Sequence, residues 1–401
     1  MTGRRVIDLL DGRLYSGKLG DVRETYAWMR ANEPIYFDEA NGVWGFASYD
    51  AVRQASIDKT TFSNAGGIRP DMGPLPMMID MDDPEHFKRR KLVSSGFTPR
   101  RVRDQADGLG AVCDSLIDDV CERGECDFVR DLALPLPMAV IGDMLGVDPA
   151  DHDQLLKWSD DMISAQGGNI TVEMMIAAND AFEAYNSHAA SVIEQRRSNP
   201  TDDLMSLLVH AEVDGDRLSD DEILQESLLI LVGGDETSRH VLSGGMEQLL
   251  LHPDQRQRLA DDPTLMPTAV EEMLRWVTPI KNMCRTMTTD LEFHGAQLKA
   301  GQKAMLLYES ANFDETKFDH PELFDIGRTP NDHLAFGIGS HFCLGNSLAR
   351  IEMITMFDRL LARLPDMELA TNEPLPRRPA NFILGLESMP VRFTPTARLN
   401  S

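Results

Sequence analysis

The sequence predicts a mainly α fold, in which small β-sheets lie beside a helical body. Seven segments carry apolar residues at a spacing of three to four, which is the period of an amphipathic helix. Three further stretches are rich in β-branched residues or alternate in polarity, with Gly and Asp between them, as strands do. No Ser/Gly/Pro-rich linker, low-complexity tract or fixed-period repeat divides the chain, so we expect one domain over residues 1–401.

The predicted elements follow one another along the chain, with one long loop among them. The helices are expected at residues 21–32, 135–145, 151–164, 171–197, 219–251, 266–277 and 345–364, and the strands near 35–47, 286–307 and 382–393. Residues 61–83, which are rich in Pro, predict an irregular loop, and long loops in compact domains are often binding elements. A surface linker is the alternative, although the apolar residues between positions 75 and 79 suit a solvated linker poorly.

Composition excludes several classes of partner. The chain has 39 basic and 65 acidic residues, a formal charge of −26, which disfavours nucleic acid and anionic membrane surfaces. No stretch approaches the roughly 18 apolar residues of a membrane span, and the N-terminal segment lacks the apolar core of a signal peptide. We therefore expect a soluble cytoplasmic protein with no membrane anchor and no nucleic-acid partner.

The cysteines predict neither disulfides nor a zinc site. There are five, an odd number, and they are scattered without a paired C-x-x-C spacing. A single cysteine is by default a small buried hydrophobe. A functional role for any of them, Cys343 included, therefore needs independent support.

That support comes from the loop at residues 336–345, Phe-Gly-Ile-Gly-Ser-His-Phe-Cys-Leu-Gly, which runs directly into a predicted helix. Its three glycines allow the backbone to approach a large flat group closely. A cysteine at a helix N-terminus gains N–H donors and the positive end of the helix dipole, which favour the thiolate, so we expect a lowered pKa for Cys343. The alternative is a glycine-rich turn around a buried cysteine.

The second signal lies in the long helix expected at 219–251. Its almost wholly apolar first part is followed by two glycines, two acids and two hydroxyls at residues 233–238. Such local violations of helix propensity and burial are typical of functional sites. The hydroxyl of Thr237 is placed to bond the carbonyl of Gly233, four residues earlier. A kink capped by surface charge is the alternative.

Together the two motifs resemble those of the cytochrome P450 family. The loop matches Phe-x-x-Gly-x-x-x-Cys-x-Gly at each fixed position, and residues 233–237 match Ala/Gly-Gly-x-Asp/Glu-Thr. The resemblance implies haem b (iron protoporphyrin IX) with the thiolate of Cys343 as the iron ligand, Phe336 covering the sulfur, and Gly345 letting the helix lie close to the porphyrin. It also implies that Glu236 and Thr237 are catalytic and relay protons to dioxygen.

The resemblance extends to residues that would support the haem. The two propionates would be bound by His86, Arg90, Arg285 and His341, which match the family's positions in order. Glu272 and Arg275, three apart on one helix face, and Arg328 match its structural ion-pair network. An ordinary surface ion pair is the alternative for this spacing.

Four stretches, at residues 62–70, 76–84, 281–285 and 385–390, are similar to the mycobacterial steroid C26-monooxygenases of P450 family 142. This similarity implies hydroxylation of the terminal side-chain methyl (C26/C27) of cholesterol or cholest-4-en-3-one, and further oxidation to the acid. We expect an apolar substrate pocket, and methionines make such a wall adaptable. Its expected members are Met77, Met78, Val232, Gly233, Ile280 and Met283. Plain core packing is the alternative for these residues, and a fatty acid or another terpenoid is the alternative substrate.

Residues 87–103 contain seven basic residues and no acidic ones, in a strongly acidic chain. We interpret Lys88, Arg89, Lys91, Arg100 and Arg101 as a docking patch for an acidic ferredoxin, which a ferredoxin reductase would supply with electrons. An ordinary solvated face is the alternative.

Three functional classes remain: a monooxygenase that uses dioxygen, a haem-binding sensor or carrier without turnover, and a haem-free helical protein. The Glu236–Thr237 pair favours the first over the second. The third must treat the cysteine loop and all four propionate-binding positions as coincidence.

Overall fold

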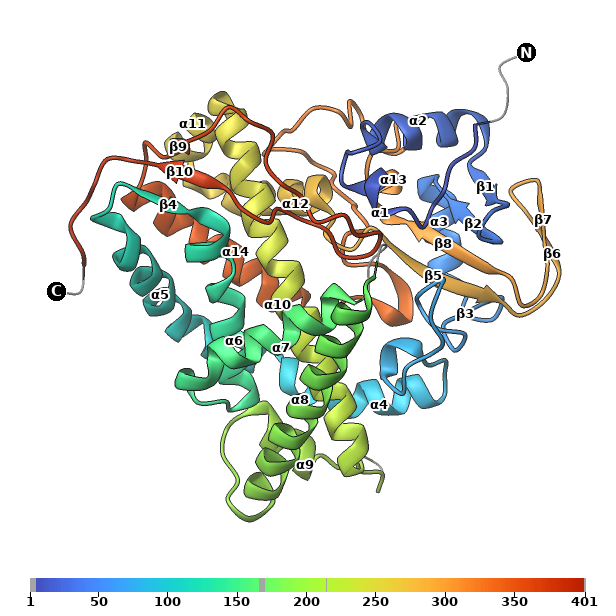
Figure 1. Cartoon of the computed structure of the whole chain (residues 1–401), viewed down its shortest axis with the longest axis horizontal. Helices are drawn as coiled ribbons and strands as arrows, with labels where there is room; N and C mark the ends of the chain where they lie inside the picture. Colours follow the sequence, from blue (N-terminus) through green and yellow to red (C-terminus); the bar gives the residue numbers. More distant parts are fainter. Residues whose placement is uncertain (1–4, 166–169, 214, 400–401) are drawn as a thin grey trace.

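The computed structural model describes residues 5–165, 170–213 and 215–399, and it confirms the mainly α fold (Figure 1). Helices make up one side of the molecule, and the N-terminal segments and the largest sheet make up the other. The helices are α1 (Gly12–Tyr15), α2 (Val22–Asn32), α3 (Tyr49–Ile57), α4 (Glu85–Val93), α5 (Pro99–Cys121), α6 (Pro135–Leu145), α7 (His152–Ser164), α8 (Val172–Ser198), α9 (Leu204–His210), α10 (Asp220–Leu251), α11 (Pro253–Asp261), α12 (Met266–Val277), α13 (Tyr308–Asn312) and α14 (Asn346–Arg363).

Three small sheets accompany the helices. The largest has the strand order β1-β2-β8-β5-β3, and its neighbouring strands are antiparallel except for the parallel pair β2 and β8. The others are β4-β10-β9 and the hairpin β6-β7. The strands are β1 (Ile35–Asp38), β2 (Val43–Phe46), β3 (Phe62–Ser63), β4 (Glu125–Asp127), β5 (Asn282–Met287), β6 (Leu291–Phe293), β7 (Ala296–Leu298), β8 (Lys303–Leu307), β9 (Glu368–Leu369) and β10 (Pro390–Arg392).

Helix α10 is the axis of the helical body, which it crosses in Figure 1. It begins with a capping box, in which Ser219 and Glu222 each accept a hydrogen bond from the other's backbone N–H. Helices α6, α8, α12 and α14 pack around it. Gly234 allows the close approach of α6, because a Cβ atom added there would lie 2.5 Å from Cδ1 of Ile141. The helix is thereby fixed on several sides at the level of the glycine-rich motif.

The predicted helices are confirmed to within one or two residues at each end. Helices α1, α3, α4, α5, α9, α11 and α13 are additional to those predicted. The longest of them, α5, begins with Pro99 and a basic run and contains Gly108 and Gly110, so its apolar period is evident only in its second half. Sequence periodicity therefore underestimated the helix content.

The strand predictions hold in part. Strands β1 and β2 lie within 35–47, but β5 begins at residue 282, four residues before the predicted start of 286. In 382–393 only residues 390–392 form a strand, and Ile383 makes an isolated bridge to Ile280. The loop at 61–83 is largely irregular as predicted, apart from β3 and a short 3₁₀ turn, η1 (Met78–Asp80).

Among the described residues, no helix has both the length and the apolar character needed to cross a membrane.

Candidate active site

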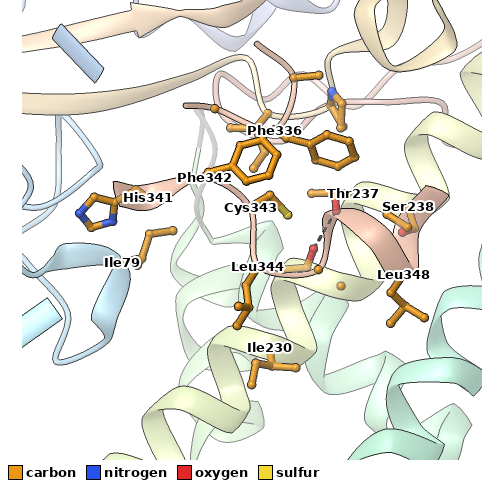
Figure 2. Close-up of a pocket in the computed structure, with 18 of the residues that line it drawn as sticks. Ile79, Ile230, Thr237, Ser238, Phe336, His341, Phe342, Cys343, Leu344 and Leu348 are labelled. Atoms are coloured by element: carbon orange, nitrogen blue, oxygen red, sulfur yellow. Dashed lines mark hydrogen bonds between the residues drawn. The ribbon is translucent and has the colours of Figure 1, made fainter. Parts of the chain in front are cut away.

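A cavity lies between α10, β5, the start of α14 and the cysteine loop. Both sequence motifs contribute to its wall. Figure 2 shows Cys343 from the loop and Thr237 from α10 facing the same space, with Phe336 and Phe342 on one side and Ile230 and Leu344 on the other. The structure thus brings together residues that are about a hundred positions apart in the sequence.

The cysteine loop has a fixed backbone. The N–H of Cys343 donates to the carbonyl oxygen of Phe336 over 2.9 Å, which closes the loop on itself. Gly339 has a φ of +85°, and a Cβ atom there would lie 2.8 Å from the carbonyl oxygen of Ser56. Both the backbone conformation and the close approach therefore require glycine at this position. The loop therefore presents the sulfur at a defined point of the cavity wall.

The expected lowering of the Cys343 pKa is wrong for the protein chain itself. Burial of the sulfur raises the pKa of the thiol, and this outweighs the lowering by the backbone N–H of Gly345 and by the positive charge of Arg90. The helix N-terminus acts in the predicted direction but is the weaker effect. A metal ion at the sulfur would supply the positive charge that the burial requires.

Thr237 makes the predicted contact with the helix backbone. Its Oγ1 donates to the carbonyl oxygen of Gly233 over 2.7 Å, as the dashed line in Figure 2 indicates. Gly233 faces open space, since a Cβ atom there would meet no atom within 4 Å. The glycine therefore keeps the cavity wide beside the hydroxyl.

Glu236 lies behind this wall, and it is not among the residues that line the cavity in the described structure. Its buried carboxylate pairs with Arg239 and lies 3.3 Å from Nε2 of His240. Burial raises its pKa, but the bond with His240 and the charge of Arg239 outweigh this and leave the pKa well below the usual carboxyl range. Arg239 also reaches Asp160, which is 37% exposed, so the cluster extends toward solvent.

Four cationic or imidazole side chains gather at one end of the cavity, as predicted. His86, Arg90, Arg285 and His341 all line it, and the rings of His86 and His341 stack at 3.9 Å between centroids. Burial lowers the pKa of His86, and burial together with neighbouring cations lowers that of His341 to about 3. Both rings are therefore neutral near pH 7 and can donate one hydrogen bond each. Nε2 of His86 is buried and has no partner among the described residues.

The three residues of the predicted ion-pair network are in contact with one another. Arg275 donates two hydrogen bonds to Glu272, of 2.8 and 2.7 Å, and both side chains are completely buried. Arg328 joins them at 3.1 Å from Oε2 of Glu272. Arg275 also donates to the carbonyl oxygens of Asn312 and Pro321. The network therefore ties α12 to the irregular segment that leads to the cysteine loop.

A second support, not predicted from the sequence, lies next to the first. Glu271 accepts hydrogen bonds from Arg350 at 2.6 and 2.9 Å and lies 3.1 Å from Nε2 of His333. Arg350 also lies over the ring of Phe336, with Cζ 4.6 Å from the centroid. Glu271 therefore connects α12 to α14 and, through Arg350, to Phe336 of the cysteine loop. The adjacent acidic pair Glu271–Glu272 in an otherwise apolar helix was the sequence signal from which this second support could have been predicted.

The expected substrate residues divide into two groups. Met78, Gly233, Ile280 and Met283 line the cavity. Met77 and Val232 do not, although Met77 is buried in the core and Val232 packs against the apolar cluster around Phe382. Ile79 and Gly234, the neighbours on the other side of Met78 and Gly233, do line the cavity. The wall is completed by residues that were not predicted, including Ile79, Ile230 and Leu229.

The basic segment is only partly exposed. Lys88, Lys91 and Arg100 are exposed, and Arg101 is partly exposed beside Asp202. Arg89 departs from the prediction, because its side chain is 13% exposed and is paired with Glu222 and Glu226 of α10. It faces the interior and not the surface patch.

Comparison with known proteins now decides the family. Residues 168–388 match the family described as "Cytochrome P450". The chain belongs to the cytochrome P450 family. It is 58% identical to a steroid C26-monooxygenase of Mycobacterium tuberculosis over 400 residues, covering 100% of both chains. It is 57% identical to the steroid C26-monooxygenase of Mycolicibacterium smegmatis, covering 99% of this chain and 98% of the relative.

Solved P450 structures have the same fold. CYP109E1 from Bacillus megaterium, in complex with corticosterone, has a TM-score of 0.86 and 32% identity, covering 93% of this chain and 98% of that chain. CYP109Q5 from Chondromyces apiculatus has a TM-score of 0.88 and 31% identity, covering 98% and 99%. A methyl-branched lipid omega-hydroxylase of Mycobacterium bovis is 38% identical, covering 93% of this chain and 92% of the relative.

The residues of this P450 fit its cofactor, haem b. Cys343 places a sulfur in the wall of a large cavity, and a Cβ atom on Gly345 would meet nothing within 4 Å, so the start of α14 leaves room for a flat group. At one end the unpartnered Nε2 of His86 and the charge of Arg90 suit carboxylates. When bound, the haem supplies oxygen activation, which the thiolate ligand favours by donating electron density.

Proposed function

We propose that this P450 hydroxylates the terminal methyl (C26/C27) of the side chain of cholesterol or cholest-4-en-3-one, and oxidises it further to the acid. The observation that carries the proposal is the 57–60% identity to three steroid C26-monooxygenases. An apolar cavity wall of Met78, Ile79, Ile230, Ile280 and Met283 supports it, because a sterol offers almost only hydrocarbon to its site. The chemistry needs an end-on approach of the side chain to the space between Cys343 and Thr237.

We assign the final proton transfer to the Oγ1 of Thr237. This hydroxyl faces the cavity and donates to the carbonyl of Gly233, so its oxygen can accept a second hydrogen bond from the cavity side. We assign proton transfer from behind the wall to Glu236, whose carboxylate is held ionised beside Arg239 and must first take up a proton. Its cluster with Arg239 reaches the partly exposed Asp160, which gives a polar connection from the surface. The carboxylate must leave Arg239 or pass the proton through water to reach Thr237.

We assign electron delivery to a ferredoxin, reduced by a ferredoxin reductase, that docks on α4 and the start of α5. Lys88 and Lys91 are exposed on α4, and Arg90 of the same helix donates a hydrogen bond to the carbonyl oxygen of Phe342. Phe342 precedes Cys343 in the chain and is 37% exposed. The basic surface therefore adjoins the partly exposed residue that precedes Cys343. An acidic partner is favoured there by charge.

A methyl-branched lipid is the second candidate substrate. Its support is the 38% identity to a methyl-branched lipid omega-hydroxylase, an enzyme that by its name also acts at a chain end. An apolar wall suits either molecule, so a direct test must compare them.

The test is turnover of cholest-4-en-3-one with a ferredoxin, its reductase and a nicotinamide donor, followed by mass spectrometry and NMR of the product. The proposal predicts oxygen at the end of the side chain, with alcohol formed before acid. Oxygen on the steroid rings would contradict the assigned position. No sterol product, together with terminal oxidation of a methyl-branched fatty acid, would favour the second candidate.

A further inference from the structure

A buried carboxylate, Glu226, stands where the sequence pattern calls for an apolar residue. It lies on α10 one turn before Ile230, which lines the cavity, and it is 0% exposed. Burial of an ionised group is costly unless it is well partnered. Core violations of this kind are concentrated at functional sites. The canonical features of the site, the iron ligand and the proton relay, do not involve Glu226.

The partners of Glu226 come from two other parts of the chain. Its Oε1 accepts a 2.8 Å hydrogen bond from the backbone N–H of Met78 and a 3.2 Å bond from Nη1 of Arg89. The same Nη1 donates to the carbonyl oxygen of Pro76 over 2.9 Å. One carboxylate and one guanidinium thus bind the backbone of the segment 76–78 from both sides. The other oxygen, Oε2, has no hydrogen-bond partner among the described residues.

The segment bound in this way forms part of the cavity wall. Met78 and Ile79 of the loop line the cavity together with Leu229 and Ile230 of α10. The carboxylate of Asp80 accepts the N–H groups of Ile68 and Leu75, at 2.8 and 2.7 Å, so the loop is folded as a unit. Movement of the segment at Met78 would therefore move the loop and change the width of the cavity.

Arg89 connects this wall to the cofactor end. It lies on α4 next to Arg90 and three residues after His86, both of which line the cavity. Its second anchor is Glu222, whose Oε1 accepts a hydrogen bond from Nη2. The Arg89–Glu226 pair consequently links the substrate wall, the central helix and the helix that carries the propionate-binding residues.

We propose that Glu226, with Arg89, is a positioning residue that latches Met78 into the cavity wall and so sets the width available to the substrate. The inference rests on the proposed sterol side-chain substrate for its role in specificity. The latch itself concerns access to the cavity and can be tested with any ligand of the haem iron. With the latch closed, the wall is narrow and suits a slender hydrocarbon chain. With it open, ligands enter faster and a sterol is held less tightly.

The test compares Glu226→Ala and Glu226→Gln with the matched control Glu222→Gln in the haem-loaded protein. Alanine removes both contacts, and glutamine keeps an acceptor for the N–H of Met78. Glu222→Gln removes an Arg89 partner from the same helix face and preserves the capping box, which accepts Gln as well as Glu. The ferrous-CO spectrum of each variant establishes that the thiolate-bound haem is intact.

The readouts are the association rate of imidazole, followed by stopped-flow absorbance, and the dissociation constant of cholest-4-en-3-one from the ferric spin-state shift. Loss of a hydrogen bond to a charged group predicts that Glu226→Ala raises both the imidazole association rate and the sterol dissociation constant by about tenfold. We expect a smaller change in Glu226→Gln and a change of less than about threefold in Glu222→Gln. An unchanged imidazole rate in Glu226→Ala would overturn the latch, as would equal effects of the alanine variant and the control. If the wild type gives no spin shift with the sterol, the proposed substrate fails, and the imidazole rates still decide the latch.

Discussion

Glu236 pairs with Arg239 on the far side of α10 from the cavity, whereas Thr237, the next residue, faces into it. The acid and the alcohol of one motif therefore have different surroundings. The acid is buried among charges that extend toward the surface, and the hydroxyl lies on the cavity wall. In the relay that we propose, this arrangement separates proton supply by Glu236 from proton delivery by Thr237.

The first prediction concerns proton delivery by Thr237. Thr237→Ala removes the hydroxyl at the cavity, so electrons should continue to reach oxygen while less product is formed. We expect product per nicotinamide consumed to fall by about tenfold or more, with hydrogen peroxide accounting for the difference, as for the loss of a general acid–base group. Thr237→Ser keeps the hydroxyl and should restore most of the coupling. Equal coupling in the alanine variant and the wild type would exclude Thr237 from the relay.

The second prediction concerns the support of the cysteine loop. Glu272→Gln leaves Arg275, which is 0% exposed, without its charged partner. Breaking a buried ion pair costs about 3–5 kcal/mol. We expect a large fall in the urea midpoint and faster transfer of haem to apomyoglobin. Glu322→Gln, at an exposed position, is the control and should change neither quantity. A stable Glu272→Gln variant that retains its haem would mean that the network is dispensable.

The third prediction concerns the proposed ferredoxin docking surface. The double variant Lys88→Glu/Lys91→Glu should slow reduction by an acidic ferredoxin by about tenfold at low ionic strength, because complementary charge mainly raises the association rate. The difference from the wild type should shrink as salt is added. Lys299→Glu, an exposed lysine outside the basic segment, is the control. A rate that is unaffected by the double change at every salt concentration would place the docking site elsewhere.

The fourth prediction concerns pH. Burial raises the pKa of Glu352 to about 7, although a hydrogen bond with Ser238 opposes the rise. The folded protein therefore favours the protonated carboxyl, while the unfolded chain ionises near the ordinary value. Between roughly pH 4.5 and 7 the folded state binds the extra proton, so this group's contribution to stability falls as pH rises through that window and levels off above it.

Glu352→Gln removes this penalty. The unfolding free energy of the variant relative to wild type should be higher at pH 8 than at pH 5 by on the order of 2–3 kcal/mol, measured by urea unfolding. Glu373→Gln, an exposed control, should show no such trend. A gain that is the same at both pH values would mean that Glu352 is ionised throughout.

Sequence reasoning located the site better than it described its electrostatics. Cys343, Thr237 and the four cationic or imidazole residues were found because they stand in local motifs, and the structure brings them to one cavity. The direction of the Cys343 pKa shift was wrong, since burial depends on packing that a motif does not contain.

The inward pairing of Arg89 was also missed. A run of basic residues predicts charge, but helix geometry decides which side chain meets the carboxylates of a distant helix, here Glu222 and Glu226. For the same reason the sequence predicted both Met77 and Met78 in the pocket, whereas only Met78 lines it. Contacts between distant segments were the information that the sequence lacked.

The measurement that tests the central claim most directly is a titration of the ferric, haem-loaded protein with cholest-4-en-3-one, followed by absorbance. Displacement of water from the iron by a sterol in the cavity predicts a saturable shift from low to high spin. A spin state that does not respond to the sterol, in protein with a thiolate-type ferrous-CO band, would contradict the steroid assignment.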